Sequence, residues 1–292
     1  MLADGSRQSI QSLVGQQPEV LTIDHQGKLA MARSDRVWEV GKRHVYRINL
    51  ASGRSIRCTA EHRLRTLWGW RRVEEIRFGD RLGVVRHLPE PSAQVSWSDH
   101  ALILLGHLVG GGSDIKHQSL RYTTASEQNS EAVREAAESM GSVVKRREGP
   151  GNCHQLLISG NGNRWQPAGV GRWLKELGIF GQRAGEKTLP NEIFQLPSDQ
   201  VARFVRHLWA TDGSITLTRN ARVRIDFSTA SQQLARDVAD LLLKFGIGAR
   251  VRHIKQPQSE GWFTVDVFGA RDQLVFLERI GAFGTQASQV GE

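Results

Sequence analysis

The sequence predicts two domains: a small, mainly β domain at the N-terminus, followed by an α+β domain with a pseudo-two-fold internal repeat. Three observations lead to this prediction: the chain length, a series of strand and turn signals before residue 90, and a long self-similarity after residue 100. A chain of 292 residues allows about two domains of ordinary size. Hydrophobic residues make up 39% and charged residues 24%, which is typical of a globular rather than a disordered protein.

The composition also excludes several classes of protein. No apolar run approaches the ~18 residues of a membrane span, and the N-terminus has no pattern of a secretory signal. The two cysteines, Cys58 and Cys153, cannot form a disulfide framework or a four-cysteine zinc site. We therefore expect a protein of the cytoplasm, where thiols stay reduced, with no membrane partner.

The net charge of +9 and the pI of about 10.1 point to a polyanionic partner. Basic domains of this size are attracted to nucleic acid above all. A basic surface that serves only solubility explains the same charge, so charge alone leaves both interpretations open.

Residues 1–92 read as short strands separated by turns. Residues 45–50 and 55–59 are strand-like and flank a glycine-containing turn, which predicts a hairpin. Further turn signals lie at 68–70 and 78–81. Strands at this spacing predict a small β domain.

The character of the sequence changes after this region. Residues 87–93 contain two prolines and predict a linker. Ser98 can cap a helix over the apolar run that follows, in which Gly106 would let a second helix approach closely.

The second domain, about 98–285, contains two copies of one pattern, at about 100–195 and 200–285. Each copy reads helix, glycine turn, strand pair, Thr-Ala-Ser cap, helix, glycine and strand, and Gly112 corresponds to Gly213. Two copies are too few for a solenoid but can form a pseudo-two-fold domain in which equivalent helices meet.

The repeat resembles the LAGLIDADG homing endonucleases, through LLGHLVGGGS at 104–113 and HLWATDGS at 207–214. The resemblance implies that the two motif helices pack together and that each ends in an acidic residue. In this family the two acids hold Mg²⁺ over the scissile phosphates of double-stranded DNA, where the metal neutralises charge and activates water.

One of the two acids is replaced in this sequence. Asp212 keeps the acid of the second motif, whereas Gly111 stands where the first acid belongs, and Asp114 is the candidate replacement as a metal ligand. Without the resemblance, Asp212 beside Gly213 would read as an ordinary turn residue. We expect nicking of one strand at best, or no cleavage.

Basic residues complete the expected DNA site. Lys187, in EKTLP, resembles the Lys-x-x-Pro block of intein endonucleases, which implies a catalytic-centre lysine. Basic residues on or beside predicted strands of both copies would contact DNA phosphates and bases: Arg121, Lys145, Arg146, Arg147, Arg222, Arg224, Arg250, Arg252 and Lys255.

The first domain resembles the N-terminal part of an intein splicing domain, the Hint fold. The resemblance rests on Gly53, Thr59 and His62 in GRSIRCTAEHRLRT and on the turns that follow. It implies autocatalytic rearrangement of the peptide bond at residue 1, in which His62 acts on the scissile amide and Thr59 assists. The whole chain most resembles mycobacterial-type inteins of the DnaB replicative helicase, whose flanking exteins would be its host.

Two features depart from a complete intein. Met1 occupies the splice-junction position, where most inteins have Cys or Ser, and Trp68 would assist in the class that lacks this nucleophile. The C-terminal splicing blocks are absent from the sequence, so we expect this chain to need a separate C-terminal intein segment.

Three functions therefore remain open: an intein fragment with an impaired endonuclease, a catalytically degenerate DNA-binding insert in a DnaB-type precursor, and one component of a two-chain autoprocessing protein.

Overall fold

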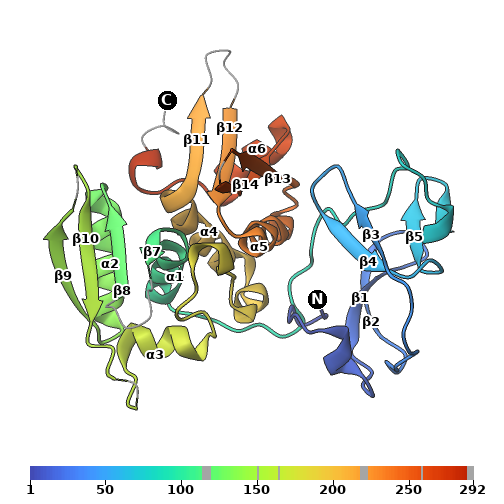
Figure 1. Cartoon of the computed structure of the whole chain (residues 1–292), viewed down its shortest axis with the longest axis horizontal. Helices are drawn as coiled ribbons and strands as arrows, with labels where there is room; N and C mark the ends of the chain where they lie inside the picture. Colours follow the sequence, from blue (N-terminus) through green and yellow to red (C-terminus); the bar gives the residue numbers. More distant parts are fainter. Residues whose placement is uncertain (114–119, 150, 164, 218–222, 258, 288–292) are drawn as a thin grey trace.

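The computed structural model describes residues 1–113, 120–149, 151–163, 165–217, 223–257 and 259–287. Figure 1 shows the β-strands of the N-terminal region and, beside them, two α+β halves that meet at helices α1 and α4. Among the described residues no helix is both long and apolar enough to cross a membrane.

The N-terminal region consists of three separate antiparallel hairpins. Their strands are β1 (Glu19–Ile23) with β2 (Leu29–Arg33), β3 (Tyr46–Asn49) with β4 (Ser55–Cys58), and β5 (Arg63–Thr66) with β6 (Gly69–Arg72). The predicted hairpin over 45–59 is confirmed as β3–β4. Gly53 in its turn has a φ of +81°, which glycine adopts without strain.

The predicted internal repeat is confirmed, because both halves contain the same elements in the same order. The first half contains α1 (Asp99–Gly111), β7 (Gly112–Ser113), β8 (Leu120–Thr124), α2 (Glu127–Ser139), β9 (Val143–Glu148), β10 (His154–Ser159) and α3 (Gly169–Glu176). The second contains α4 (Ser198–Asp212), β11 (Gly213–Leu217), β12 (Val223–Thr229), α5 (Gln232–Leu242), β13 (Ala249–Gln256), β14 (Ser259–Val267) and α6 (Ala270–Arg279).

The two sheets share one topology. Their strand orders are β7-β8-β10-β9 and β11-β12-β14-β13, and all pairs are antiparallel. Short 3₁₀ helices occur at Ile10–Leu13, Val73–Glu75, Ala184–Glu186, Asn191–Gln195, Leu243–Phe245 and Gly284–Gln286.

Serine side chains cap the N-termini of three α-helices. The Ser98 hydroxyl accepts a hydrogen bond from the Ala101 N–H at 3.3 Å, as the sequence predicts for α1. The serines of the two Thr-Ala-Ser segments, Ser126 and Ser231, cap α2 and α5 in the same way. The recurring cap therefore sets equivalent helix starts in the two halves.

Helices α1 and α4 pack against each other through the glycines of α1. A Cβ added to Gly106 would lie 2.8 Å from the Leu208 N, and one added to Gly110 would overlap the Thr211 side chain. The expectation that Gly106 permits close approach is thus confirmed, with Gly110 one turn later. One continuous hydrophobic core, which runs from Leu102 to Ile280, surrounds this helix pair.

The segment over 87–93 has no regular structure, as the linker prediction requires, but it is packed rather than free. The Leu88 N–H donates to the Leu243 carbonyl at 2.9 Å, and the Ser92 N–H donates to the Ala3 carbonyl at 3.0 Å. The domain boundaries at 92 and 98 stay a prediction.

Candidate active site and nucleic-acid interface

The ends of α1 and α4 form the candidate active site. Gly111 is the last residue of α1 and Asp212 is the last residue of α4, so the two occupy equivalent positions. The Asp212 side chain is exposed, yet protein atoms packed around the carboxyl raise its pKa, and the nearby charge of Lys187 opposes that rise. The carboxylate is thus partly surrounded by protein and still reached by solvent.

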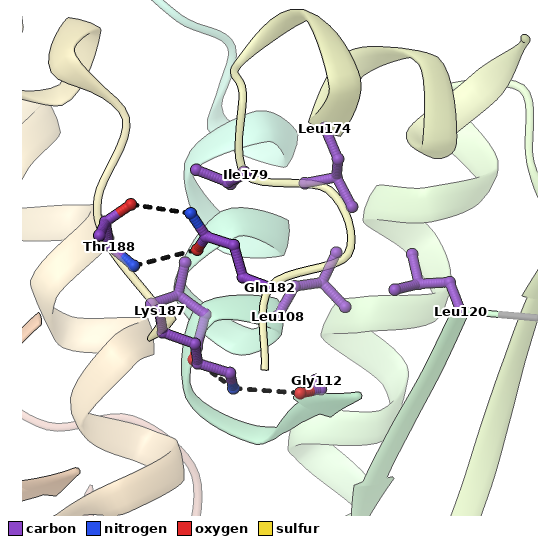
Figure 2. Close-up of a pocket in the computed structure, with 9 residues that line it drawn as sticks. Leu108, Gly112, Leu120, Leu174, Ile179, Gln182, Lys187 and Thr188 are labelled. Carbon is purple, nitrogen blue, oxygen red and sulfur yellow. Dashed lines mark hydrogen bonds between the residues drawn. The ribbon is translucent and has the colours of Figure 1, made fainter. Parts of the chain in front are cut away.

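Lys187 lies at the end of α1 (Figure 2). Its Nζ donates to the carbonyls of Val109 and Gly110 at 2.7 Å and to that of Gly112 at 3.1 Å, so all three ammonium protons are engaged. Burial lowers the pKa of Lys187, while the Asp212 carboxylate acts in the opposite direction. A cation at a helix C-terminus is favourable, and here it also flanks the position where the acid is replaced.

Neutral amides take the corresponding place at the end of α4. The Gln286 Nε2 donates to the carbonyls of Trp209 at 3.0 Å and Gly213 at 2.6 Å, and the Asn129 Nδ2 donates to that of Ala210 at 3.1 Å. Among the described residues, the end of α1 therefore has an ammonium group but no acid, whereas the end of α4 has an acid but no ammonium group.

Sequence reasoning missed Gln286, although a signal was present. GAFG at 281–284 repeats GIFG at 178–181, so the segments that follow α6 and α3 are also related. Extending the repeat to these segments would have placed Gln286 near a motif helix.

Tyr122 occupies the space beside Gly111. A Cβ added to Gly111 would lie 2.9 Å from the Tyr122 ring, which is buried and contacts His107 through its hydroxyl at 2.9 Å. An aromatic ring therefore packs where a side chain at position 111 would start, and Phe227 takes the equivalent register position in the second half.

Two histidines lie buried between the motif helices. The His107 Nε2 and His207 Nδ1 are 3.1 Å apart, so one ring nitrogen donates and the other accepts. Burial, with the neighbouring imidazole, lowers the pKa of His107 to about 3. Burial, with Arg206 and Arg203 nearby, lowers that of His207 to about 4. Both rings are therefore neutral at physiological pH.

The donor set for a divalent metal is small. In the described part of the chain, no three His, Cys, Asp or Glu residues cluster as a metal site, and Asp114 lies outside the described residues. A single carboxylate is enough for Mg²⁺ when substrate phosphates and water complete its shell. Asp212 fits such a role, and no described carboxylate lies at the Gly111 position.

The basic residues of the first sheet divide between its two faces. Arg121 and Lys145 both oppose Leu157 in the sheet register, and Arg147 shares their face, which is not covered by α2. Arg146 points the other way and pairs with Glu127 of α2 at 2.6 Å. The structure thus separates Arg146 from the residues with which the sequence grouped it.

The open face of the second sheet carries acids as well as arginines. Arg224 pairs with Asp226 at 2.8 Å and Arg252 pairs with Asp266 at 2.5 Å. Arg250 lies on the same face, opposite Asp266 in the register, while Arg222 is outside the described residues. Lys255 is exposed near the end of β13. These ion pairs are not among the contacts expected from the sequence.

Of the residues expected to act in splicing, Thr59 and His62 lie in one turn, but among the described residues no hydrogen bond joins either of them to Met1 or Trp68. His62 is exposed, and its N–H donates to the Thr59 carbonyl at 3.2 Å in the turn before β5. Trp68 is 78% exposed. Met1 instead lines a small cavity with Leu21, Pro91, Phe194 and other residues at the junction with the C-terminal half.

Comparison with known proteins gives matches to both parts of the chain. Residues 199–281 match the model of the LAGLIDADG-like domain. The chain is 38% identical over 98% of its length to the replicative DNA helicase DnaB of Rhodothermus marinus, and 34% identical over 97% to that of Synechocystis. It spans 31% and 33% of those helicases, about a third of their length.

Two solved structures represent the structural matches. The homing endonuclease I-DmoI in complex with DNA and Mn aligns with a TM-score of 0.44 and 14% identity over 63% of this chain and 97% of its own. A Ssp DnaB mini-intein variant aligns with a TM-score of 0.28 and 35% identity over 32% of this chain and 59% of its own.

Proposed function

We propose that this chain, an intein of the DnaB type with a LAGLIDADG homing endonuclease domain, binds double-stranded DNA and hydrolyses a single strand of it. One observation carries the proposal: the ends of the two motif helices are equivalent in structure, but only α4 ends in an acid. Asp212 would bind the divalent metal, Mg²⁺ in the cell, and that metal would supply charge neutralisation at the phosphate and an activated water.

Lys187 would serve the same reaction from the end of α1. Its ammonium group is fixed by three carbonyls and is partly desolvated, so it places a positive charge near Asp212 with little reorganisation. The second half-site, beside Gly111, has the lysine but no carboxylate among the residues that the structure describes, and we expect the opposite DNA strand to remain intact.

The DNA would lie on the open faces of the two sheets. Arg121, Lys145, Arg147 and Arg250 are available there for phosphate contacts. Arg224 and Arg252 are paired with Asp226 and Asp266, so they must exchange these carboxylates for phosphates or act as fixed, partly neutralised positions. The carboxylates on this surface would repel misplaced phosphates, which favours one position of the DNA over others.

We further propose that residues 1–92 form the N-terminal part of a splicing domain, in which Thr59, His62, Trp68 and the junction at Met1 act once a C-terminal intein segment adds its strands. Two-stranded hairpins are marginally stable alone, and this region holds three of them with large apolar side chains in solvent. Strands from that segment would cover these side chains and bring His62 toward the junction. The host would be a DnaB-type helicase.

A second candidate function is DNA binding without cleavage. The glycine at the end of α1 favours it, because no carboxylate of the described residues occupies that position. This alternative and the nicking reaction differ in whether Asp212 still acts on a bound phosphate.

Cleavage of a supercoiled plasmid that carries the uninterrupted helicase gene tests the proposal. We expect nicked circles with Mg²⁺ or Mn²⁺ and none with Asp212→Asn, while filter binding shows that both proteins still bind the plasmid. A linear product would contradict the single-strand proposal. Binding without nicking would establish the non-cleaving alternative.

A further inference from the structure

A buried carboxylate connects Arg7, which precedes the N-terminal hairpins, to the segment that contains the lysine of the candidate active site. Asp237 lies on α5 and is 2% exposed. Its Oδ1 accepts from the Arg7 Nη1 at 2.5 Å and from the Gln233 Nε2 at 2.9 Å. Its Oδ2 accepts from the Leu189 N–H at 3.2 Å. The Asp237 side chain thus joins Arg7 to the segment of chain that contains Lys187.

The segment from Lys187 to Leu189 is fixed mainly by its neighbours, because it lies in no helix or strand. The Ser231 hydroxyl, at the start of α5, donates to the Lys187 carbonyl at 2.6 Å. Thr188 exchanges two hydrogen bonds with Gln182 (Figure 2). The Leu189 N–H has the Asp237 carboxylate as its partner. The position of the Lys187 ammonium at the end of α1 therefore depends on α5.

Arg7 is held firmly enough to fix Asp237 in turn. Its second guanidinium nitrogen donates to Asp240 at 2.5 Å, and its guanidinium carbon lies 3.6 Å from the centre of the Phe194 ring. A buried carboxylate needs a charged partner, and a fork of two nitrogens across two carboxylates specifies geometry as well as charge.

We propose that Arg7 is a positioning residue for Lys187: it fixes the Asp237 carboxylate, which holds the Leu189 backbone, so that docking of the N-terminal region sets the lysine at the end of α1. The meaning of this contact for catalysis rests on the proposed endonuclease function, whereas the contact itself does not. The endonuclease site would then report whether the splicing domain is docked.

Arg54 provides a matched control. It also joins the N-terminal region to α5, through Asp240 at 2.5 Å and the Ala239 carbonyl at 3.1 Å, but no hydrogen bond or ion pair of the described residues joins it to Asp237. Arg54→Met weakens docking without touching the carboxylate that holds Leu189. Arg7→Met removes the charge and keeps an unbranched side chain over Phe194.

The test is the pH profile of Lys187 acetylation by acetic anhydride in the full-length chain, followed by mass spectrometry with exposed Lys145 as the internal reference. We expect Arg7→Met to raise the plateau rate of Lys187 acetylation by roughly fivefold or more and to move its midpoint to higher pH, because the released amine is solvated. Arg54→Met should change the rate by less than about twofold. Arg7→Lys, which keeps a charge without the fork, should be intermediate and serves if Arg7→Met does not fold.

Equal effects of the Arg7 and Arg54 variants would overturn the proposal, since docking alone would then explain them, as would an unchanged Lys187 profile in Arg7→Met. Where the wild-type chain nicks DNA, Arg7→Met should lower kcat and leave KM for DNA unchanged. If the wild type does not nick, the proposed function fails while the acetylation result still decides the proposal about Arg7.

Discussion

The N-terminal and C-terminal regions of the chain differ in how far they bury their apolar side chains. The C-terminal region encloses one continuous core around α1 and α4. The N-terminal region buries few apolar residues, among them Leu13, Cys58 and Val73, and these do not belong to that core. Trp38, Trp68, Trp70 and Phe78 of the N-terminal region lie in solvent instead. The difference indicates that the repeat is stable by itself, while the hairpins depend on what they dock against.

Breaking the helix pair should have the largest effect on this comparison. Gly106→Val places methyl groups against the Leu208 N and Phe204 carbonyl, which belong to the backbone and cannot move aside. We expect a loss of about 3 kcal/mol or more in the free energy of unfolding, measured by urea denaturation. Gly185→Ala, at an open position with no atom within 4 Å, is the control and should change stability little. Wild-type stability in the Gly106 variant would show that the helices do not meet closely.

The helix pair was predictable because its cause is local and repeated. The amino-acid sequence alone shows two copies of one pattern, with Gly106 on an apolar helix and serine caps at matching places. The register that turns Arg146 toward α2 was not predictable, since one residue of strand shift exchanges the two faces of a sheet. The pairing of Arg224 with Asp226 could have been predicted, because residues two apart on a strand share one face.

A second prediction uses pH to weaken the C-terminal core selectively. In the folded protein His107 and His207 have pKa values of about 3 and 4, below the ordinary 6.5. At pH values between the folded and the ordinary pKa, the unfolded chain therefore binds more protons than the folded chain. The free energy of unfolding therefore has its full value above about pH 6.5 and decreases as the pH falls toward 4. The decrease amounts to a few kcal/mol, because each unit of pKa shift corresponds to about 1.4 kcal/mol. Chemical denaturation at pH 7, 6 and 5 measures this decline.

Removing both histidines should flatten that profile. The double variant His107→Gln, His207→Gln has no imidazole to protonate in the core, so its stability between pH 7 and 5 should vary much less than that of wild type. His253→Gln, on an exposed part of β13, is the control and should keep the wild-type slope. An equally steep decline in the double variant would assign the effect to other groups.

Limited proteolysis sharpens the same contrast between regions. Residues 34–45 have no regular structure and join two hairpins, so a protease should cut there before it cuts within the repeat. We expect initial cleavage about tenfold faster in residues 1–92 than in the C-terminal half, because local opening is cheap where few apolar contacts form. N-terminal sequencing of the fragments would refute this if the first cuts fall between α1 and α6.

The candidate site was only half predictable for a physical reason. Asp212 and Lys187 belong to motifs, so their residue types are visible in sequence. The three carbonyls that hold Lys187, and the amides of Gln286 and Asn129 at the other helix end, are contacts between segments far apart in the chain. Such contacts depend on how these segments pack together, which no single segment specifies.

The smallest expected effect distinguishes the two faces of the first sheet in DNA binding. Lys145→Ala removes a charge from the open face, so the dependence of log K on log salt should weaken by about one unit and affinity should fall for all sequences alike. Arg146→Ala removes a charge that lies toward α2 and is already compensated by Glu127, so the salt slope should stay close to that of wild type. Both slopes can be measured by fluorescence anisotropy on one labelled duplex. Equal losses from the two variants would mean that Arg146 leaves Glu127 to reach the phosphates, and the duplex would then contact both faces of the strand rather than the open sheet alone.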